Sequence, residues 1–270
     1  PGIMGGLLGQ GAPEAANAAG FSDSPHIMYS GYDRKGEWFQ LFQIGFGGIP
    51  GRPVGDGPDG HSLWPAFTNV PNEYIESYFP LRIVEYTSIA DSGGPGLHRG
   101  GNGVSVAYQF LEPGEISIHD DRWLTYPWGV NGGLPGARSS KLLRRADGSE
   151  AWLPAKCDRV KVAAGDILYF NTWGGGGWGD PLKRSPALVA RDIACGLVTP
   201  VGARRYGVVV REDRSVDAEA TEALRRTMTD ARPEPTLFNR GGSVDALKAL
   251  CLAETHLPPP RSPEFVREAA

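Results

Sequence analysis

The sequence predicts an α+β fold that is predominantly β, with a barrel- or sandwich-like β body followed by a C-terminal helical segment. The 38 glycines and 23 prolines among 270 residues favour many turns and few long helices. Short runs of β-branched and aromatic residues follow one another between glycine-containing turns. After Pro181 the pattern changes to helix start and stop signals. We therefore expect an N-terminal arm over residues 1–36, a β-rich body over 37–182 and a helical segment over 183–270.

Turn signals predict how the strands of the body connect. Pro113-Gly114 predicts a hairpin between the strands that flank it, and Asp147-Gly148 predicts a second one. Ala164-Gly165 separates the last two strands. The expected strands are 37–44, 82–89, 104–111, 115–119, 141–144, 150–153, 159–162 and 166–170.

Capping residues mark the helices. One short helix is expected in the arm, around residues 13–19. In the C-terminal segment a hydroxyl residue precedes proline twice, at Ser185 and Thr199, and glycine follows each run, at Gly196 and Gly207. Amphipathic spacing predicts the two remaining helices. These helices are expected over 217–230 and 243–254.

Composition excludes several classes of protein. A hydrophobic fraction of 40% is enough to bury a core, so the chain is not disordered. The net charge of −4 comes without a long run of Lys or Arg, and no apolar stretch approaches the roughly 20 residues of a membrane span. We expect neither a nucleic-acid nor a membrane partner. Three widely spaced cysteines fit neither a disulfide framework nor a zinc motif, and they favour a cytoplasmic protein.

Four glycine-rich segments stand out. They read GFGGIPGRPVGDGPDG from Gly45, DSGGPGLHRGGNG from Asp91, GVNGGLPG from Gly129 and TWGGGGWGDP from Thr172. None has the lysine of a phosphate-binding Walker loop or opens a helix in a dinucleotide-binding unit. Two interpretations stay open: tight turns with close backbone packing, or a backbone cradle for an anion or a partner chain.

Charged residues beside these segments are the candidate catalytic groups. Glu73 and Glu76 are three residues apart, so a helix or turn would place both on one face as an acid/base pair or as ligands. Asp91 and Arg99 are interleaved with glycines in the second segment. The alternative for the two glutamates is a non-catalytic role as a solvated or salt-bridged pair, with Arg82 as a partner.

His119 is the fifth candidate. It begins the run His119-Asp120-Asp121-Arg122 at the end of an expected strand, where a metal or proton-relay site is conceivable. A structural polar cluster is the alternative. Because neither the five histidines nor the three cysteines show ligand spacing, we expect no metal bound by this chain.

Several sequence blocks, in order, resemble the C-terminal part of the hydantoinase B/5-oxoprolinase family. They are GFGGIPGRPVGDGPDG, NEYIESYFP, DSGGPGLHRGGNG, DDRWLTYPWGVNGGLPGARS, WGGGGWGDPLKRSPALVARDIACGLVT and ARRYGVVV. Together they span roughly residues 29–210. The blocks around Trp64, His119 and Trp128 are most similar to the matching subunits of aromatic-ketone carboxylases such as acetophenone carboxylase.

The resemblance implies a division of labour between chains. A hydantoinase A-like partner binds ATP and phosphorylates a carbonyl or enol oxygen of a small-molecule substrate, which is then carboxylated or hydrolysed. Family subunits are longer, and in the carboxylases the additional N-terminal half carries His and Asp metal ligands. The chain is therefore expected to be either a split subunit, with a further chain that carries the missing half, or a fragment. The resemblance places ATP and Mg²⁺ in partner subunits and leaves open a transition metal there.

Three functional hypotheses follow. The chain is a subunit of an ATP-dependent carboxylase acting on a ketone, or of a cyclic amide hydrolase of the hydantoinase or oxoprolinase type, and is inactive alone. A second hypothesis is a non-catalytic scaffold within such a complex. The third, a free-standing β-rich binding module, fits the charge but not the family resemblance.

Overall fold

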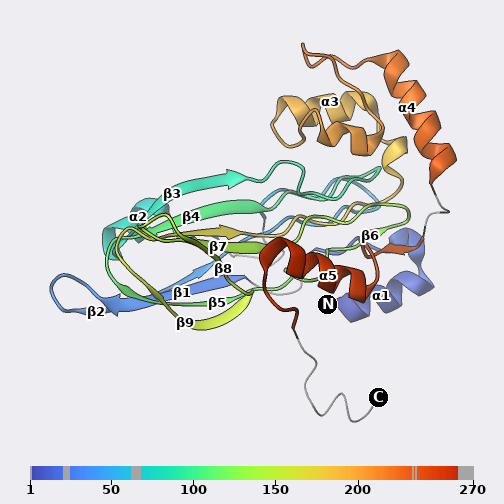
Figure 1. Cartoon of the computed structure of the whole chain (residues 1–270). Helices are drawn as coiled ribbons and strands as arrows, with labels where there is room; N and C mark the ends of the chain where they lie inside the picture. The colour runs from blue at the N-terminus through green and yellow to red at the C-terminus, as the bar shows by residue number, and fades with distance from the viewer. Residues whose placement is uncertain (1, 21–24, 62–67, 233, 235, 261–270) are drawn as a thin grey trace, which may run out of the picture.

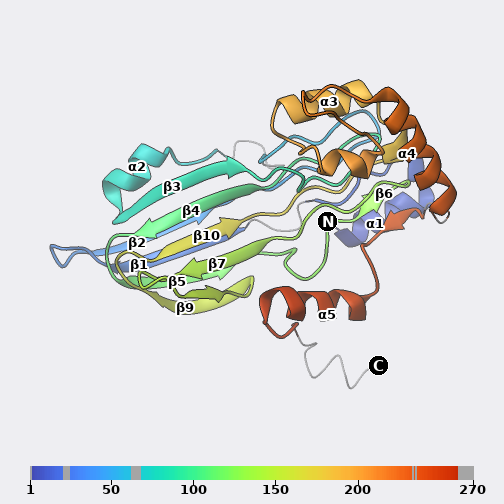
Figure 2. The same ribbon diagram turned by 45° about the horizontal axis from the view of Figure 1, so that its top comes forward.

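The structure is a computed structural model that describes residues 2–20, 25–61, 68–232, 234 and 236–260. Two antiparallel sheets face each other, with helices at both ends of them (Figures 1 and 2). The first sheet has the order β2 (Trp38–Ile44), β1 (His26–Tyr32), β5 (Gly114–His119) and β9 (Lys156–Val162). The second has the order β3 (Leu81–Ser88), β4 (Val104–Phe110), β10 (Ile167–Asn171), β7 (Ser140–Arg144) and β8 (Glu150–Trp152).

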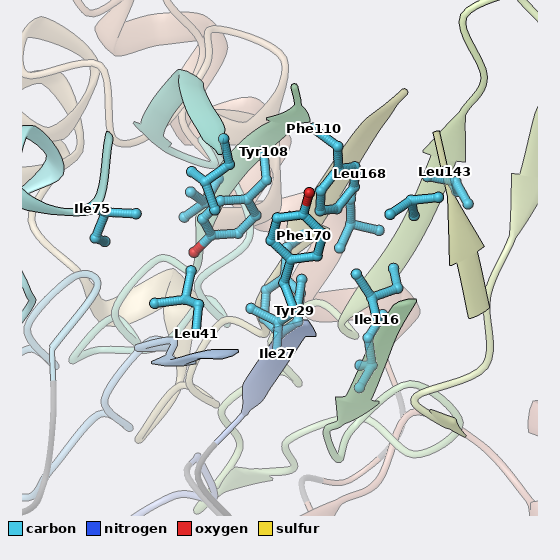
Figure 3. Packing of buried hydrophobic residues seen from close by; sticks show 14 of the residues in the cluster. Ile27, Tyr29, Leu41, Ile75, Tyr108, Phe110, Ile116, Leu143, Leu168 and Phe170 are labelled. Atoms are coloured by element: carbon cyan, nitrogen blue, oxygen red, sulfur yellow. The ribbon is translucent and has the colours of Figure 1, made fainter. Parts of the chain in front are cut away.

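The core lies between the two sheets. Apolar side chains from both sheets, together with Ile75 from helix α2 (Asn72–Tyr78), form one buried cluster (Figure 3). Each such side chain contributes about 1.5–3 kcal/mol on burial. Neither sheet closes on itself, so the body is a sandwich rather than a barrel. The expectation of a predominantly β α+β fold is confirmed.

The predicted hairpin around Pro113-Gly114 is wrong. β4 pairs with β3 and β10, whereas β5 pairs with β1 and β9 in the other sheet. Both strands carry buried apolar residues, and each buries them best by facing the other across the core rather than by pairing at its edge. The hairpin around Asp147-Gly148 is confirmed, since β7 pairs with β8 and Gly148 has a φ of +85°.

The β body begins before residue 37. β1 lies inside the stretch expected to be an arm, and it is paired on both sides, by β2 and by β5. The stretch before it contains α1 (Gly2–Gly11) and a 3₁₀ turn, η1 (Pro13–Ala15), where one short helix was expected. A two-stranded ribbon joins β6 (Gly129–Val130) to β11 (Phe238–Asn239).

Helices dominate the C-terminal segment, as expected. A 3₁₀ turn, η2 (Pro181–Lys183), leads into α3 (Pro186–Ala194), which packs with a second 3₁₀ turn, η3 (Gly202–Tyr206), in a separate small core. Thr199 begins that turn, because its Oγ1 accepts a hydrogen bond from the N–H of Gly202. The last helices are α4 (Ala218–Ala231) and α5 (Val244–Thr255), capped by Asp217 and Ser243. None of the described helices is long and apolar enough to cross a bilayer.

Candidate functional site

The glycine-rich segments form a bundle of extended chains beyond the ends of the sheets (Figures 1 and 2). The segment at 172–179 lies among the others, and its backbone bonds to chains at 17–20, 47–51, 92–103 and 127–137. An added Cβ on Gly48 would lie 1.9 Å from the carbonyl oxygen of Gly101, so the chains touch where a side chain would be.

This packing supports the first interpretation of the glycines, close backbone packing, and argues against an anion cradle. Backbone N–H groups of the glycines donate to backbone carbonyls within the bundle, at 2.7–2.9 Å. This holds for Gly94, Gly100, Gly101, Gly175 and Gly177. Groups committed in this way cannot cradle an anion. The glycines therefore serve close approach of chains, which makes the bundle a rigid frame for the side chains at its edges.

Arg99 lies at one edge of this bundle, with 3% of its surface exposed. Its guanidinium forms a two-pronged ion pair with Asp59, at 2.7 and 3.1 Å, and also donates to the carbonyl of Gly100. Burial lowers the pKa of Arg99, but the hydrogen bonds and charge of Asp59, together with the charge of Asp192, outweigh it and raise the pKa.

Arg184 extends this ion network to the helices. It is fully buried, and its guanidinium donates two hydrogen bonds of 2.7 Å to the Asp56 carboxylate and one of 2.8 Å to Asp192. Asp192 lies on α3, whereas Asp56 lies in the first glycine segment. The network therefore fastens α3 to the bundle, and the Arg99 guanidinium is held within it.

Asp91 fastens the next helical turn. Its backbone has a φ of +63°, its Oδ1 accepts the N–H of Thr199 at 2.9 Å and its Oδ2 accepts the Thr199 hydroxyl. Arg205 donates to the carbonyl oxygen of Asp91. These contacts place the carboxylate within the protein's own hydrogen-bond network.

Glu73 and Glu76 lie on α2, at the opposite end of the sandwich from α3 (Figures 1 and 2). Both side chains are exposed. Glu76 accepts a hydrogen bond of 2.8 Å from the N–H of Ile83, which ties α2 to β3. The helix expected to put both glutamates on one surface is present, but it does not bring them to Asp91 or Arg99.

His119 ends β5 and contacts His26 of β1, with 4.9 Å between the ring centroids. The next residue, Asp120, is fully buried and paired with Lys141. Burial lowers the pKa of Lys141, and the negative charge of Asp120 opposes that shift. Because Asp120 is committed to Lys141, it does not join His119 as a ligand. The described residues contain no group of three or more His, Cys, Asp or Glu side chains placed to hold a metal.

A cavity of about 530 Å³ lies where the N-terminal stretch meets the bundle. Arg122 and Trp128 form one side of it, and the guanidinium of Arg122 lies 5.1 Å from the centre of the Trp128 ring. Helix α1 and the chain after it form the other side, with Leu8 and a series of alanines and glycines.

The structure thus separates the five predicted residues into three places, and it adds others that the sequence did not single out. Asp56, Asp59, Arg184 and Asp192 complete the ion network, and Arg122 lines the cavity. Arg122 follows the two aspartates after His119 in the sequence. Its contacts with Gly20 and Trp128, however, depend on the fold and could not be predicted from that position. Trp64, part of the resemblance to aromatic-ketone carboxylases, lies outside the described residues.

Comparison with known proteins bears on the whole arrangement. The profile of the hydantoinase B/oxoprolinase family matches residues 2–181. The B-type subunit of a putative D-/L-hydantoinase from Pseudomonas sp. (strain NS671) is 32% identical over 213 residues, which cover 77% of this chain and 36% of that protein. The acetophenone carboxylase delta subunit of Aromatoleum aromaticum is 27% identical over 244 residues, covering 76% of this chain and 36% of that subunit.

Solved structures agree on the fold. The crystal structure of the ATP-dependent caprolactamase from Pseudomonas jessenii superposes with a TM-score of 0.66 at 26% identity, covering 81% of this chain and 40% of that one. The chain therefore spans well under half the length of each of these proteins. The family match over residues 2–181 includes the glycine bundle, both sheets and the Arg122 cavity, and the chain belongs to the hydantoinase B/oxoprolinase family.

Proposed function

We propose that this chain works as the C-terminal part of a hydantoinase B-like subunit in an ATP-dependent, multi-subunit carboxylase that acts on a ketone such as acetophenone. The observation that carries this proposal is the similarity to the acetophenone carboxylase delta subunit over 76% of the chain. We expect the chain to be inactive by itself, since activity in this proposal depends on the ATP-binding partner.

Partner chains supply the remaining chemistry in this proposal. ATP with Mg²⁺ is bound by a hydantoinase A-like subunit, which transfers a phosphoryl group to the substrate oxygen, and another chain contributes the N-terminal half with any transition metal. This chain supplies the rigid bundle and the side chains at its edges. Glu73, Glu76 and His119 stay candidate catalytic groups, whereas Asp91 and Arg99, which already have partners in the chain, act as positioning residues.

Hydrolysis of a cyclic amide is the second candidate. Its support is the D-/L-hydantoinase relative, which is more similar in sequence at 32% identity, and the superposition on caprolactamase. A scaffold without substrate contact is the third, supported by the bundle's internal hydrogen bonds. In this proposal both reactions begin with the same activation by ATP. They differ in the next step, in which the activated substrate is either carboxylated or hydrolysed.

The test starts from the native complex. Affinity purification of the tagged chain, with mass spectrometry of the chains that accompany it, should identify a hydantoinase A-like subunit and the missing half. The complex is then given ATP with acetophenone and ¹⁴C-bicarbonate, or with hydantoin, caprolactam or 5-oxoproline.

Carboxylation requires acid-stable radioactivity that depends on both ATP and acetophenone. Opened amide product without fixed carbonate would favour hydrolysis and refute the ketone assignment. Full activity of a complex that lacks this chain would refute any catalytic contribution.

A further inference from the structure

Three arginines in the described part of the chain are buried, and one differs from the other two. Arg99 and Arg184 each hold a carboxylate with two bonds. Arg122 is 9% exposed, yet no carboxylate of the described residues lies within ion-pair distance of it. Its contacts are an Nε donation to the carbonyl of Gly20 at 3.2 Å and the face of the Trp128 ring.

The direction of the pKa shift also distinguishes Arg122 from the other two arginines. Carboxylate partners raise the pKa of Arg99 and Arg184 despite burial. Burial lowers the pKa of Arg122, and the nearby charge of Asp121 only partly opposes it. Asp121 pairs with Lys156 at 3.3 Å. A buried cation is costly unless an anion accompanies it, and the described residues supply Arg122 with no ion-paired carboxylate, so this position is suited to a bound anion.

The backbone holds Arg122 in this unfavourable place. Its φ is +64°, a conformation that costs a residue with a side chain about 1–2 kcal/mol. Ser139 fixes the turn, since its N–H donates to the carbonyl of Arg122 and its hydroxyl donates to that of Asp121. Strain maintained by such contacts is typical of binding and catalytic positions.

The cavity beside Arg122 has the chemistry to complete the pair. Its described lining contains Arg52 and Arg122 but no Asp or Glu. Apart from Asn17, the other walls are Trp128, Leu8, Ile49 and small apolar residues. A volume of about 530 Å³ falls in the range of small-molecule sites. A cation at one side and apolar walls at the others suit a ligand with an anionic end and a hydrocarbon or aromatic body.

We propose that this cavity binds a small organic carboxylate, with the carboxylate on the guanidinium of Arg122 and the apolar body against Trp128. The guanidinium offers parallel N–H donors that match a carboxylate in geometry. An inorganic anion would pair with Arg122 but would leave the apolar walls unfilled. The inference rests on the cavity alone and holds whichever reaction the assembled enzyme performs.

Calorimetric titration and ligand-observed NMR on the full chain test the proposal, with benzoate, its neutral analogue benzamide and inorganic phosphate as probes. Benzoate should bind, and benzamide should bind at least about tenfold more weakly because it lacks the charge. Phosphate should bind more weakly than benzoate because it gains nothing from the apolar walls. Equal binding of benzamide would overturn the role of charge, and tighter binding of phosphate would overturn the organic ligand.

Two variants locate the site. Arg122→Gln should weaken benzoate binding about tenfold or more, and Arg122→Lys should restore part of it. Ala12→Trp leaves Arg122 in place but fills the cavity, so it should also abolish binding. Leu7→Trp is its control, because Leu7 is 60% exposed on α1 and is not part of the lining.

Circular dichroism checks that each variant is folded. A folded Ala12→Trp variant that binds benzoate like the unaltered chain would overturn the proposal, as would unchanged binding by Arg122→Gln. The assays need neither ATP nor a partner chain. A negative result here would therefore leave the proposed carboxylase function standing, and failure of that function would leave this site standing.

Discussion

Replacing Gly48 by alanine tests whether close packing of the bundle holds the protein together. The added Cβ would lie 1.9 Å from the carbonyl oxygen of Gly101 and 2.5 Å from the amide nitrogen of Gly175, whereas side-chain carbons essentially never come within 3.0 Å of such atoms. Both obstacles are backbone atoms, so no side chain can rotate away. The chains must separate by about 1 Å.

The hydrogen bonds at this point set the size of the effect. The N–H of Gly48 donates to Trp173 at 2.8 Å, that of Gly101 to Ile49 at 2.7 Å and that of Gly175 to Gly101 at 2.8 Å. A buried backbone group left without its partner costs about 1–3 kcal/mol. Loss of two of these bonds predicts a destabilisation of about 2–6 kcal/mol, a large part of the roughly 5–15 kcal/mol that stabilises a typical protein.

Urea unfolding followed by circular dichroism measures this loss as a lower midpoint and a smaller free energy of unfolding. Gly6→Ala on α1 is the matched control, because an added Cβ there meets nothing within 4 Å. That change should leave stability unchanged or raise it by up to about 1 kcal/mol. If Gly48→Ala unfolds within about 0.5 kcal/mol of the unaltered protein, the bundle does not restrain the chain as argued.

Four further expectations follow from the site. Burial raises the pKa of Asp56, but the hydrogen bonds and charge of Arg184 outweigh burial and lower the pKa. The stability that the ionised Asp56 adds is therefore present above its unfolded pKa of about 3.9 and is lost as the pH falls through the folded pKa. Asp56→Asn should weaken the dependence of folding stability on pH in the acid range, and an unchanged dependence there would contradict this. Glu73→Gln should change the free energy of unfolding by less than about 0.5 kcal/mol, because Glu73 is exposed. Asp91→Asn should lower it by about 1–3 kcal/mol, because the Asp91 carboxylate accepts the N–H of Thr199. If Glu73→Gln leaves the turnover of the assembled complex unchanged, Glu73 is no longer a catalytic candidate. The chain purified alone should contain far less than one equivalent of metal by elemental analysis, and a stoichiometric ion lost in His119→Ala would show the opposite. The isolated chain should bind no ATP at micromolar concentration, and a micromolar affinity in calorimetry would refute the assignment of ATP to a partner.

Local signals predicted the helical segment well. The helices expected over 217–230 and 243–254 are present as α4 and α5, because amphipathic spacing is a local pattern. The turn at Asp147-Gly148 is equally local, and the hairpin formed there was predicted correctly. Ser185 marked the start of α3, although its side chain makes no capping bond.

Non-local choices were not predictable in the same way. Nothing near Pro113 tells whether the strands on either side pair with each other or separate into two sheets, since that depends on which faces must be buried against each other. The five candidate residues also had no visible distances between them. The structure puts Glu73 and Glu76 on α2, Asp91 and Arg99 against the C-terminal helices, and His119 at the end of β5.

The sequence by itself determined the α+β class, the helical C-terminal segment, the family and the unusual concentration of glycine. Only the tertiary structure decided what the glycines are for, which carboxylates Arg99 and Arg184 hold, and that Arg122 has no such partner among the described residues. The physical reason is range: capping, turn formation and strand propensity act over a few residues, whereas backbone contact between glycines and the pairing of Arg184 with Asp56 join positions far apart in the chain. Such contacts exist only once the whole bundle has formed.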